Sequence, residues 1–129
     1  MIGSNAFNYI NVLDKAADAS WMRNEVITNN IANINTPGYK RKDVQFESYL
    51  MSALLGDNAL DKRVANANLN SLNANIYTDN ASFSYRLDGN NVDIDTESAY
   101  LAENQIKYYN LLDSMTQEFS RLKSVLTSR

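Results

Sequence analysis

The sequence contains no cysteine and no histidine, and these two absences exclude several kinds of chemistry. Without cysteine, the chain has no disulfide framework, no cysteine nucleophile and no thiolate metal site. Without histidine, it lacks the commonest general base and the commonest metal ligand. A net charge of -3 argues against a nucleic-acid binder, and no apolar run is long enough to span a bilayer. We therefore expect neither a cofactor nor a metal.

Proline and glycine are also scarce, with one proline and four glycines in 129 residues. Few helix breakers favour long helices, and this length suits a single domain over residues 1–129. The first residues lack a basic leader followed by a long apolar core, so we do not expect an ordinary secretory signal. The predicted fold class is mainly α: long N- and C-terminal helices that pack as a coiled coil, a short middle helix, and a flexible Asn-rich middle with a short strand.

Apolar residues recur at helical spacing from about residue 5 to residue 35. Pro37-Gly38 suits the centre of a type II turn and ends this helix, so residues 36–42 are predicted to form a turn. The expected apolar stripe consists of Phe7, Ile10, Leu13, Ala17, Trp21, Ile27, Ile31 and Ile34.

The middle of the chain carries weaker patterns. Apolar residues at spacing four predict a short helix over about 43–55. Residues 56–92 are predicted to be a flexible segment, because the apolar residues that alternate with asparagine there are mostly small. Alternation at Phe83, Tyr85 and Leu87 favours a short strand or hairpin arm.

A second long helix is predicted over about 93–127, with Asp93 and Asp95 as N-terminal caps. Its apolar residues follow 4-3-4-3-4 spacing, which is a heptad seam. The seam consists of Tyr108, Leu112, Met115, Phe119, Leu122 and Leu126.

Each long helix has further apolar residues away from its main stripe. Met22 and Val26, with Val12 and Ala19 nearby, form a second patch on the first helix. Ala99, Ala102, Ile106 and Tyr109 form one on the last helix. Two alternatives are open: the patches contact other chains, or the middle of the chain folds over them.

The polar residues suggest little catalysis. Asp93 and Asp95 are typical of helix caps rather than of an acid/base pair. Lys40-Arg41-Lys42 after the turn is interpreted as a solvated charge run rather than as a phosphate site, because a single glycine does not make a phosphate-binding loop.

One segment is specific. The run Asn29-Asn30-Ile31-Ala32-Asn33, followed after two residues by Thr36-Pro37-Gly38-Tyr39, resembles the N-terminal signature of the flagellar rod, hook and hook-filament axial family. Asp88-Gly89-Asn90-Asn91-Val92-Asp93, with Glu97, is similar to the motif that opens the last helix in short proximal-rod members. The resemblance covers about residues 5–50 and 86–129.

This resemblance implies a structural protein without enzymatic activity. Such proteins pass unfolded through the flagellar type III export apparatus without a cleaved signal, and assemble in the periplasm into the helical rod. The implied partners are other copies of the chain, other rod proteins, a FliE-type junction protein and the inner-membrane ring. We expect the two stripes, the second patches and the Asn run to form subunit contacts.

Asn29, Asn30 and Asn33 lie on the helical wheel away from Ile27, Ile31 and Ile34. Their amides are expected to bond a neighbouring subunit or the Pro37-Gly38 turn, although solvated positions near a helix end give the same pattern. The alternative function is a secreted coiled-coil adaptor or effector that forms a finite complex. A carboxylate-based enzyme is a third, weaker hypothesis.

Overall fold

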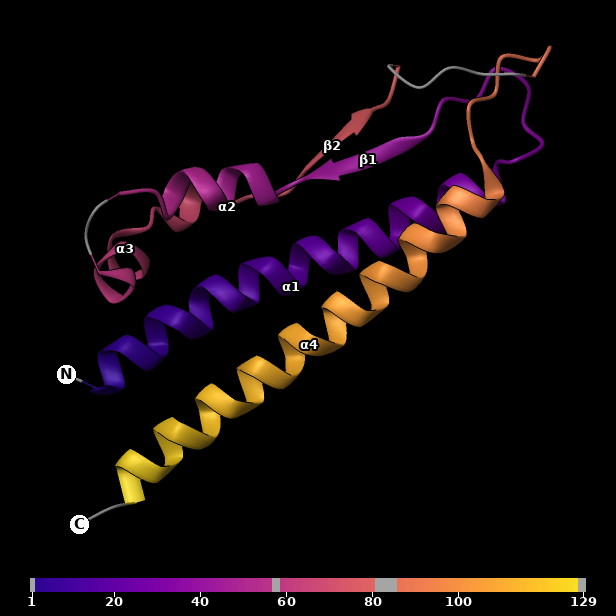
Figure 1. Ribbon diagram of the computed structural model, residues 1–129. Helices are drawn as coiled ribbons and strands as arrows, with labels where there is room; N and C mark the ends of the chain where they lie inside the picture. The colour runs from indigo at the N-terminus through magenta and orange to yellow at the C-terminus, as the bar shows by residue number, and fades with distance from the viewer. Residues whose placement is uncertain (1, 57–58, 81–85, 128–129) are drawn as a thin grey trace.

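The structure of the chain is a computed structural model that describes residues 2–56, 59–80 and 86–127. Two long helices dominate it, α1 (Ile2–Ala32) and α4 (Ile94–Thr127). They lie side by side and antiparallel, so that the start of α1 is close to the end of α4 (Figure 1). The predicted mainly α fold with two paired long helices is confirmed. None of the helices described has the length and apolar character needed to cross a membrane.

The turn that follows α1 has the predicted form. Gly38 has a φ of +72°, which a type II turn requires at its third position, and the Tyr39 amide donates to the Thr36 carbonyl at 3.2 Å. The helix itself ends at Ala32, earlier than the predicted end near residue 35. Asn33 and Ile34 belong to the turn instead, where their carbonyls accept side-chain bonds from a later part of the chain.

The start of α4 is capped as expected. Asp93 Oδ1 accepts the amide of Asp95 at 2.9 Å and that of Thr96 at 3.3 Å. These amides have no partner inside the helix, so the carboxylate both satisfies them and interacts favourably with the helix dipole. Asp95 lies in the first turn of α4, and its backbone rather than its side chain takes part in the cap.

The α1–α4 contact combines apolar and polar pairs. Ile27 of α1 is 1% exposed, and the ring centroids of Trp21 and Tyr108 lie 5.8 Å apart. Near the middle of the pair, the Asn104 side-chain amide donates to the Ser20 carbonyl at 2.8 Å. These contacts fix the register of the two helices, because a shift along the axis would bury Asn104 without its acceptor.

The middle of the chain packs along α1 (Figure 1). It contains β1 (Lys42–Gln45), α2 (Glu47–Ala53), α3 (Leu60–Asn66), the 3₁₀ turn η1 (Leu69–Ser71) and β2 (Asn75–Thr78). The two strands are antiparallel, with Lys42 opposite Thr78 and Gln45 opposite Asn75. A small core joins this region to α1: Phe46 and Leu72, 3% and 1% exposed, cluster with Ala19.

The middle of the chain differs from its prediction in two respects. The predicted short helix is present as α2, but it begins at Glu47 rather than near residue 43, because residues 42–45 pair with a strand 30 or more positions away that local periodicity does not reveal. Within the segment 56–92, predicted to be flexible, the described residues include α3, η1 and β2. Buried Val64, and bonds from Tyr9 to Asp61 at 2.6 Å and from Arg63 to the Leu54 carbonyl at 2.8 Å, hold α3 in place.

The predicted strand at Phe83, Tyr85 and Leu87 falls largely outside the described residues. Phe83 and Tyr85 belong to the undescribed part, and Leu87 lies in a turn with its side chain fully exposed.

The second apolar patches of the two long helices differ in solvent exposure. Val12, Ala19 and Val26 of α1 are buried, so for α1 the middle of the chain covers the patch, and Met22 is half-buried. Of the two alternatives left open for this patch, the burial favours the one in which the middle of the chain folds over it. On α4, by contrast, Ala99, Ala102, Ile106 and Tyr109 are all exposed.

Candidate assembly interface

A buried polar network joins the turn after α1 to the start of α4. We call it the polar junction: Asn30, Tyr39, Arg41, Asp79, Asn90, Asn91 and Glu97. At its centre Arg41 Nε donates to Glu97 Oε1 at 2.5 Å and Nη1 to Asp79 Oδ2 at 2.8 Å. Arg41 is 7% exposed and Glu97 0%. The pair connects residues that are 56 positions apart.

The electrostatics of the polar junction keep Arg41 charged. Burial alone would lower the pKa of its guanidinium, but the hydrogen bonds to Glu97 and Asp79 outweigh that effect and raise the pKa above its ordinary value. The ring of Tyr100 lies 5.5 Å below the guanidinium carbon and adds a cation–π contact. The interpretation of Lys40-Arg41-Lys42 as a solvated run is therefore wrong for Arg41, because Glu97 and Asp79 compensate its burial.

Asn30 acts as a substitute strand partner. Its amide donates to the Lys42 carbonyl at 2.8 Å, and its Oδ1 accepts the Lys42 amide at 2.9 Å. The same Oδ1 accepts the Tyr39 hydroxyl at 3.0 Å, and the amide also reaches Glu97 at 3.2 Å. Asn30 is fully buried, so these bonds satisfy both of its polar ends.

Asn90 and Asn91 close the polar junction from the other side. The Asn90 amide donates to the carbonyls of Asn33 and Thr36 at 2.9 Å each. These carbonyls follow the end of α1, where no helical N–H is available to bond them. Asn91 accepts the Arg41 amide at 2.7 Å and donates to the Asp79 carbonyl at 2.8 Å. The loop before α4 is thereby fixed to the end of α1.

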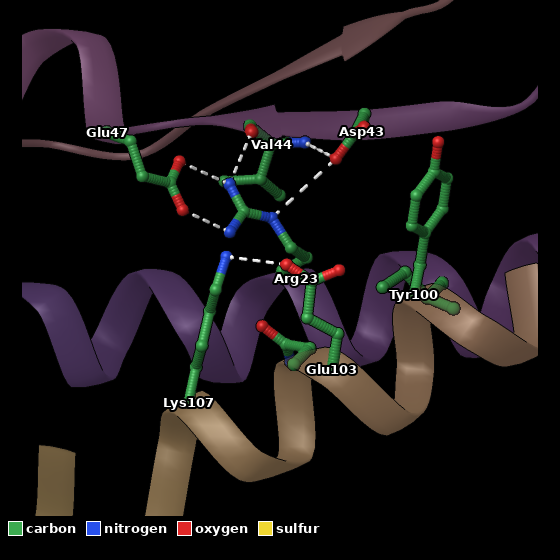
Figure 2. Close-up of a pocket in the computed structure, with 9 residues that line it drawn as sticks. Arg23, Asp43, Val44, Glu47, Tyr100, Glu103 and Lys107 are labelled. Atoms are coloured by element: carbon green, nitrogen blue, oxygen red, sulfur yellow. Dashed lines mark hydrogen bonds and ion pairs between the residues drawn. The ribbon is translucent and has the colours of Figure 1, made fainter. Parts of the chain in front are cut away.

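Beside the polar junction, a groove runs along α1 between α4 and the β1–α2 segment. Its first half is a cavity of about 250 Å³ with charged walls. Figure 2 shows Arg23 of α1 pointing at Glu47, with Glu103, Lys107 and Tyr100 facing it from α4. Arg23 binds both carboxylate oxygens of Glu47 and donates to the Val44 carbonyl at 2.8 Å. The hydrogen bond from Arg23 lowers the pKa of Glu47.

The second half of the groove is apolar. It is a cavity of about 320 Å³, lined by Ala16 and Ala19 of α1, Phe46 and Leu50 of the middle region, and Leu111 and Ser114 of α4. Glu47 and Lys107 line both cavities, so the two lie next to each other along α1. We call the two together the α1 groove.

The C-terminal half of α4 presents an unusual row of exposed apolar side chains. Leu112, Phe119 and Leu126 are spaced seven residues apart, and their exposure rises from 38% to 51% to 76% along the helix. Their heptad partners Tyr108, Met115 and Leu122 are half-buried, and the Tyr108 ring lies beside Trp21 of α1. One edge of the seam is thus packed within the chain, and the other faces solvent.

Comparison with known proteins identifies the family. A family model described as flagella basal body rod protein matches residues 10–40. The chain is 40% identical over 117 residues to flagellar basal body rod protein FlgB of Bacillus subtilis (strain 168), an alignment that covers 89% of this chain and 90% of the relative. The chain belongs to the FlgB family.

Two further FlgB proteins agree with this assignment. That of Borrelia hermsii is 34% identical over 131 residues, covering 94% of this chain and 92% of the relative. That of Escherichia coli (strain K12) is 32% identical over 115 residues, covering 82% and 83%. As a FlgB-family member, the chain is a structural subunit of the proximal rod of the flagellar basal body. It is not an enzyme, and it assembles with other rod components.

The residues predicted to form FlgB subunit contacts fall into three groups. Ile10, Ala17, Val26 and Ile27 are buried within the chain. Those that are partly buried are Leu13, Met22, Ile31, Ile34, Tyr108, Met115 and Leu122. Those that are exposed are Trp21, Ile106, Tyr109, Leu112, Phe119 and Leu126. The last group is available to a neighbouring subunit without rearrangement.

The motif residues of the FlgB signature also fall into two groups, those with hydrogen bonds inside the chain and those exposed to solvent. Asn30 lies in the polar junction, and Asn33 bonds within its own turn, where it accepts the Thr36 hydroxyl at 3.0 Å. Asn29, Ala32, Pro37 and Gly38 are exposed. The expected bonding of the Asn run to the turn thus holds for Asn33, while Asn30 bonds to the strand that follows the turn.

The residues that sequence reasoning missed are the partners of Arg41 and Asn30. Glu97 enters the sequence prediction only with the motif that opens the last helix, whereas it is the buried counter-ion of Arg41. Asn104 lies among exposed positions of α4 and was not singled out, yet it is 2% exposed. The spacing offers only a weak signal: Glu97, Asn104 and Leu111 follow one another at seven residues, but this row is neither of the two rows that make up the heptad seam.

Proposed function

We propose that this chain forms a helical tube with other copies of itself and with neighbouring rod proteins, in which it transmits torque and surrounds the export channel. We further propose a FliE-type junction protein and the inner-membrane ring as its neighbours at the base of the rod. The single observation that carries the proposal is the exposed edge of the α4 seam, Leu112, Phe119 and Leu126. A heptad edge left in water is typical of a helix that packs against another subunit.

The length of the helical pair supports a load-bearing role. At about 1.5 Å per residue, the 34 residues of α4 extend about 50 Å. Stiffness over that length comes from many small contacts with α1, together with the polar junction that locks one end. Subunits joined along such helices resist twisting better than subunits joined by loops, because hydrogen bonds and close packing restrain the backbone dihedral angles of packed helices.

Phe119→Asp tests the proposed surface. The side chain is 51% exposed, so the chain alone tolerates the charge, whereas a charge enclosed by a neighbouring subunit costs several kcal/mol. We expect Phe119→Asp and Leu112→Asp to abolish rod formation and motility, measured by electron microscopy of basal bodies and by swimming. Ser98→Asp adds the same charge at an exposed polar position of α4, outside residues 115–127 and outside the lining of the α1 groove, and serves as the matched control.

The outcome contrary to this proposal is a normal rod built from Phe119→Asp. A folded variant, with the helical circular dichroism of the natural chain, must be shown in the same experiment, so that loss of assembly is separated from loss of fold.

The export route is a separate part of the proposal. Passage through the flagellar export apparatus without a cleaved signal predicts that the chain in isolated rods has its full mass. Mass spectrometry of the rod-incorporated protein checks this, and a chain shortened at its N-terminus would contradict it.

A further inference from the structure

The α1 groove has the shape of a site for a third helix. Its floor is a row on α1, Ala16, Ala19 and Arg23, spaced by three and four residues. Its wall on α4 is a row with the same kind of spacing, which includes Glu103, Lys107 and Leu111. Two neighbouring helices that present parallel rows of this kind leave a furrow into which the ridge of another helix fits.

The floor of the groove permits close approach. Ala16, Ala19 and Ser20 are small, and helix axes approach to about 8–10 Å where the side chains between them are small. Phe46 and Leu50 provide the apolar side on the middle region. The described residues of this chain leave about 320 Å³ of this apolar half unfilled, which is the space of a few large side chains.

The C-terminal half of α4 has the complementary character. Phe119 and Leu126 are exposed on one edge of it. Residues 115–127 carry Arg121 and Lys123 against one acidic residue, Glu118, so the net charge of the segment is positive, and Arg121 pairs with Glu118 at 2.9 Å. The charged half of the groove holds three carboxylates and two cations, so its net charge is negative. An apolar, basic helix therefore matches a groove that is apolar at one end and acidic at the other.

A chain cannot fill its own α1 groove with this segment, because residues 115–127 continue the same straight helix whose residues 100–114 form the groove wall. The occupant must come from another molecule. Resting on the proposed self-assembly of the chain, we propose that the α1 groove of one copy receives residues 115–127 of α4 from a second copy, with Phe119 in the apolar half and the basic side chains toward the carboxylates.

This contact joins two different surfaces of the same chain. Such a heterologous contact does not close on itself unless the rotation between copies happens to complete a ring, and otherwise it repeats as a helical array. The contact also buries the exposed row Leu112, Phe119 and Leu126, because each subunit inserts its row into the next subunit.

The absence of native cysteine allows a clean test by disulfide cross-linking. Ser114→Cys places a thiol on the groove wall, and Ser120→Cys places one on the inserted segment. Six residues on a helix span about 9 Å along the axis, too far for a disulfide within one chain. Basal bodies from cells whose rod contains the double variant should give, after mild oxidation, a ladder of dimers and larger cross-linked species of this chain.

The controls separate this geometry from random contact. Each single cysteine variant should give no dimer, because a groove-to-segment contact never brings two identical positions together. Ser52→Cys with Ser120→Cys, which moves the first thiol to the exposed face of α2, should also give none. Dimers of a single variant, a cross-link to a different polypeptide, or no ladder from rods that contain the double variant would each overturn the proposal.

A charge reversal gives a second, independent readout. Lys123→Glu should reduce the ladder about three- to fivefold, the effect of one exposed charge pair of up to about 1 kcal/mol, and Glu103→Lys in the same chain should restore it. Lys62→Glu on α3 makes the same change away from the groove and should leave the ladder unchanged. If rods form normally but neither readout responds, the groove proposal fails while self-assembly stands. If the folded double cysteine variant enters no rod, self-assembly through α4 fails with it.

Discussion

The two ends of the α1–α4 pair differ in which side chains they bury and which they expose. At one end the polar junction buries charged and amide side chains and satisfies them within the chain, as Arg41 and Glu97 show. At the other end α4 carries apolar side chains that remain in water, and Leu126 is 76% exposed. The usual arrangement of polar residues outside and apolar residues inside is thus inverted along a single helix.

The comparison teaches where the chain depends on itself and where it depends on others. A buried ion pair with hydrogen-bonded neighbours is costly to assemble and costly to break, so it specifies one geometry. An exposed apolar row contributes little to the stability of a single chain and gains free energy only on contact with a partner. The junction end therefore determines the shape of the subunit, and the opposite end determines what the subunit joins.

The largest expected effect is at the junction end. Glu97→Ala leaves Arg41 buried without its closest counter-ion, and removing one partner of a buried pair costs about 3–5 kcal/mol. Because Asp79 still pairs with Arg41, we expect a loss of about 3 kcal/mol in the free energy of unfolding, measured by denaturant titration. Glu103→Ala, at an exposed ion pair of the same helix, is the control with a loss of at most about 1 kcal/mol. Equal losses would remove the distinction between buried and exposed pairs on α4.

A slightly smaller effect separates the apolar residues. Leu72→Ala empties part of the core that joins the middle region to α1, and a buried Leu→Ala change typically costs at least about 2 kcal/mol. Leu126→Ala changes the same side chain at a position that is 76% exposed, with an expected loss below about 0.5 kcal/mol. Calorimetric unfolding of the two variants measures the difference. A large loss for Leu126→Ala would mean that the open end is packed within a single chain after all.

Adjacent asparagines offer a finer comparison. Asn30→Ala leaves the Lys42 backbone groups without their side-chain partner, and a buried group left unsatisfied costs about 1–3 kcal/mol. We expect a loss in the lower half of that range. Asn29→Ala, one position earlier and exposed, should cost less than about 0.5 kcal/mol. Hydrogen exchange of the Lys42 amide is the direct readout, and unchanged protection in Asn30→Ala would show that Asn30 is not the strand partner.

The smallest effect concerns pH. The hydrogen bond from Arg23 lowers the pKa of Glu47 in the folded chain, so its contribution is present above the ordinary glutamate pKa of about 4.3 and is lost as the pH falls through the folded value. Glu47→Gln should therefore be slightly less stable than the natural chain at pH 7, and the gap should narrow as the pH falls below about 4.3. In an Arg23→Gln background the gap should be absent across the same pH range. A gap that does not narrow as the pH falls would contradict the assignment.

The sequence allowed the helical part of this structure to be predicted because periodicity is local. Stripes at three- and four-residue spacing reveal α1 and α4, and Pro37 and Gly38 mark the turn. β1 was missed because its partner, β2, lies far along the chain, so no nearby residue signals the pairing. α3 was missed because a seven-residue helix rich in charged and small residues is held by contacts such as Tyr9 to Asp61, which only the folded chain brings together.

The candidate site was predictable to the same degree. Exposed members of the stripes, such as Phe119, were selected on spacing alone, because an apolar side chain at heptad spacing looks the same whether it is covered by α1 or by another subunit. The role of Arg41 was not visible, since Lys40 and Lys42 flank it and the sequence gives no reason to single it out. Only the position of Glu97 across the turn distinguishes the three cations.

The 56 positions between Arg41 and Glu97 have a consequence for how the subunit comes into being. Whether a ribosome or a narrow conduit delivers the polypeptide, it arrives one end first, and one member of the pair emerges long before the other. Until its counterpart follows, the early member stays hydrated, because its buried site does not yet exist. The polar junction can therefore form only after most of the polypeptide has arrived, whatever contacts α1 and the middle region make before then.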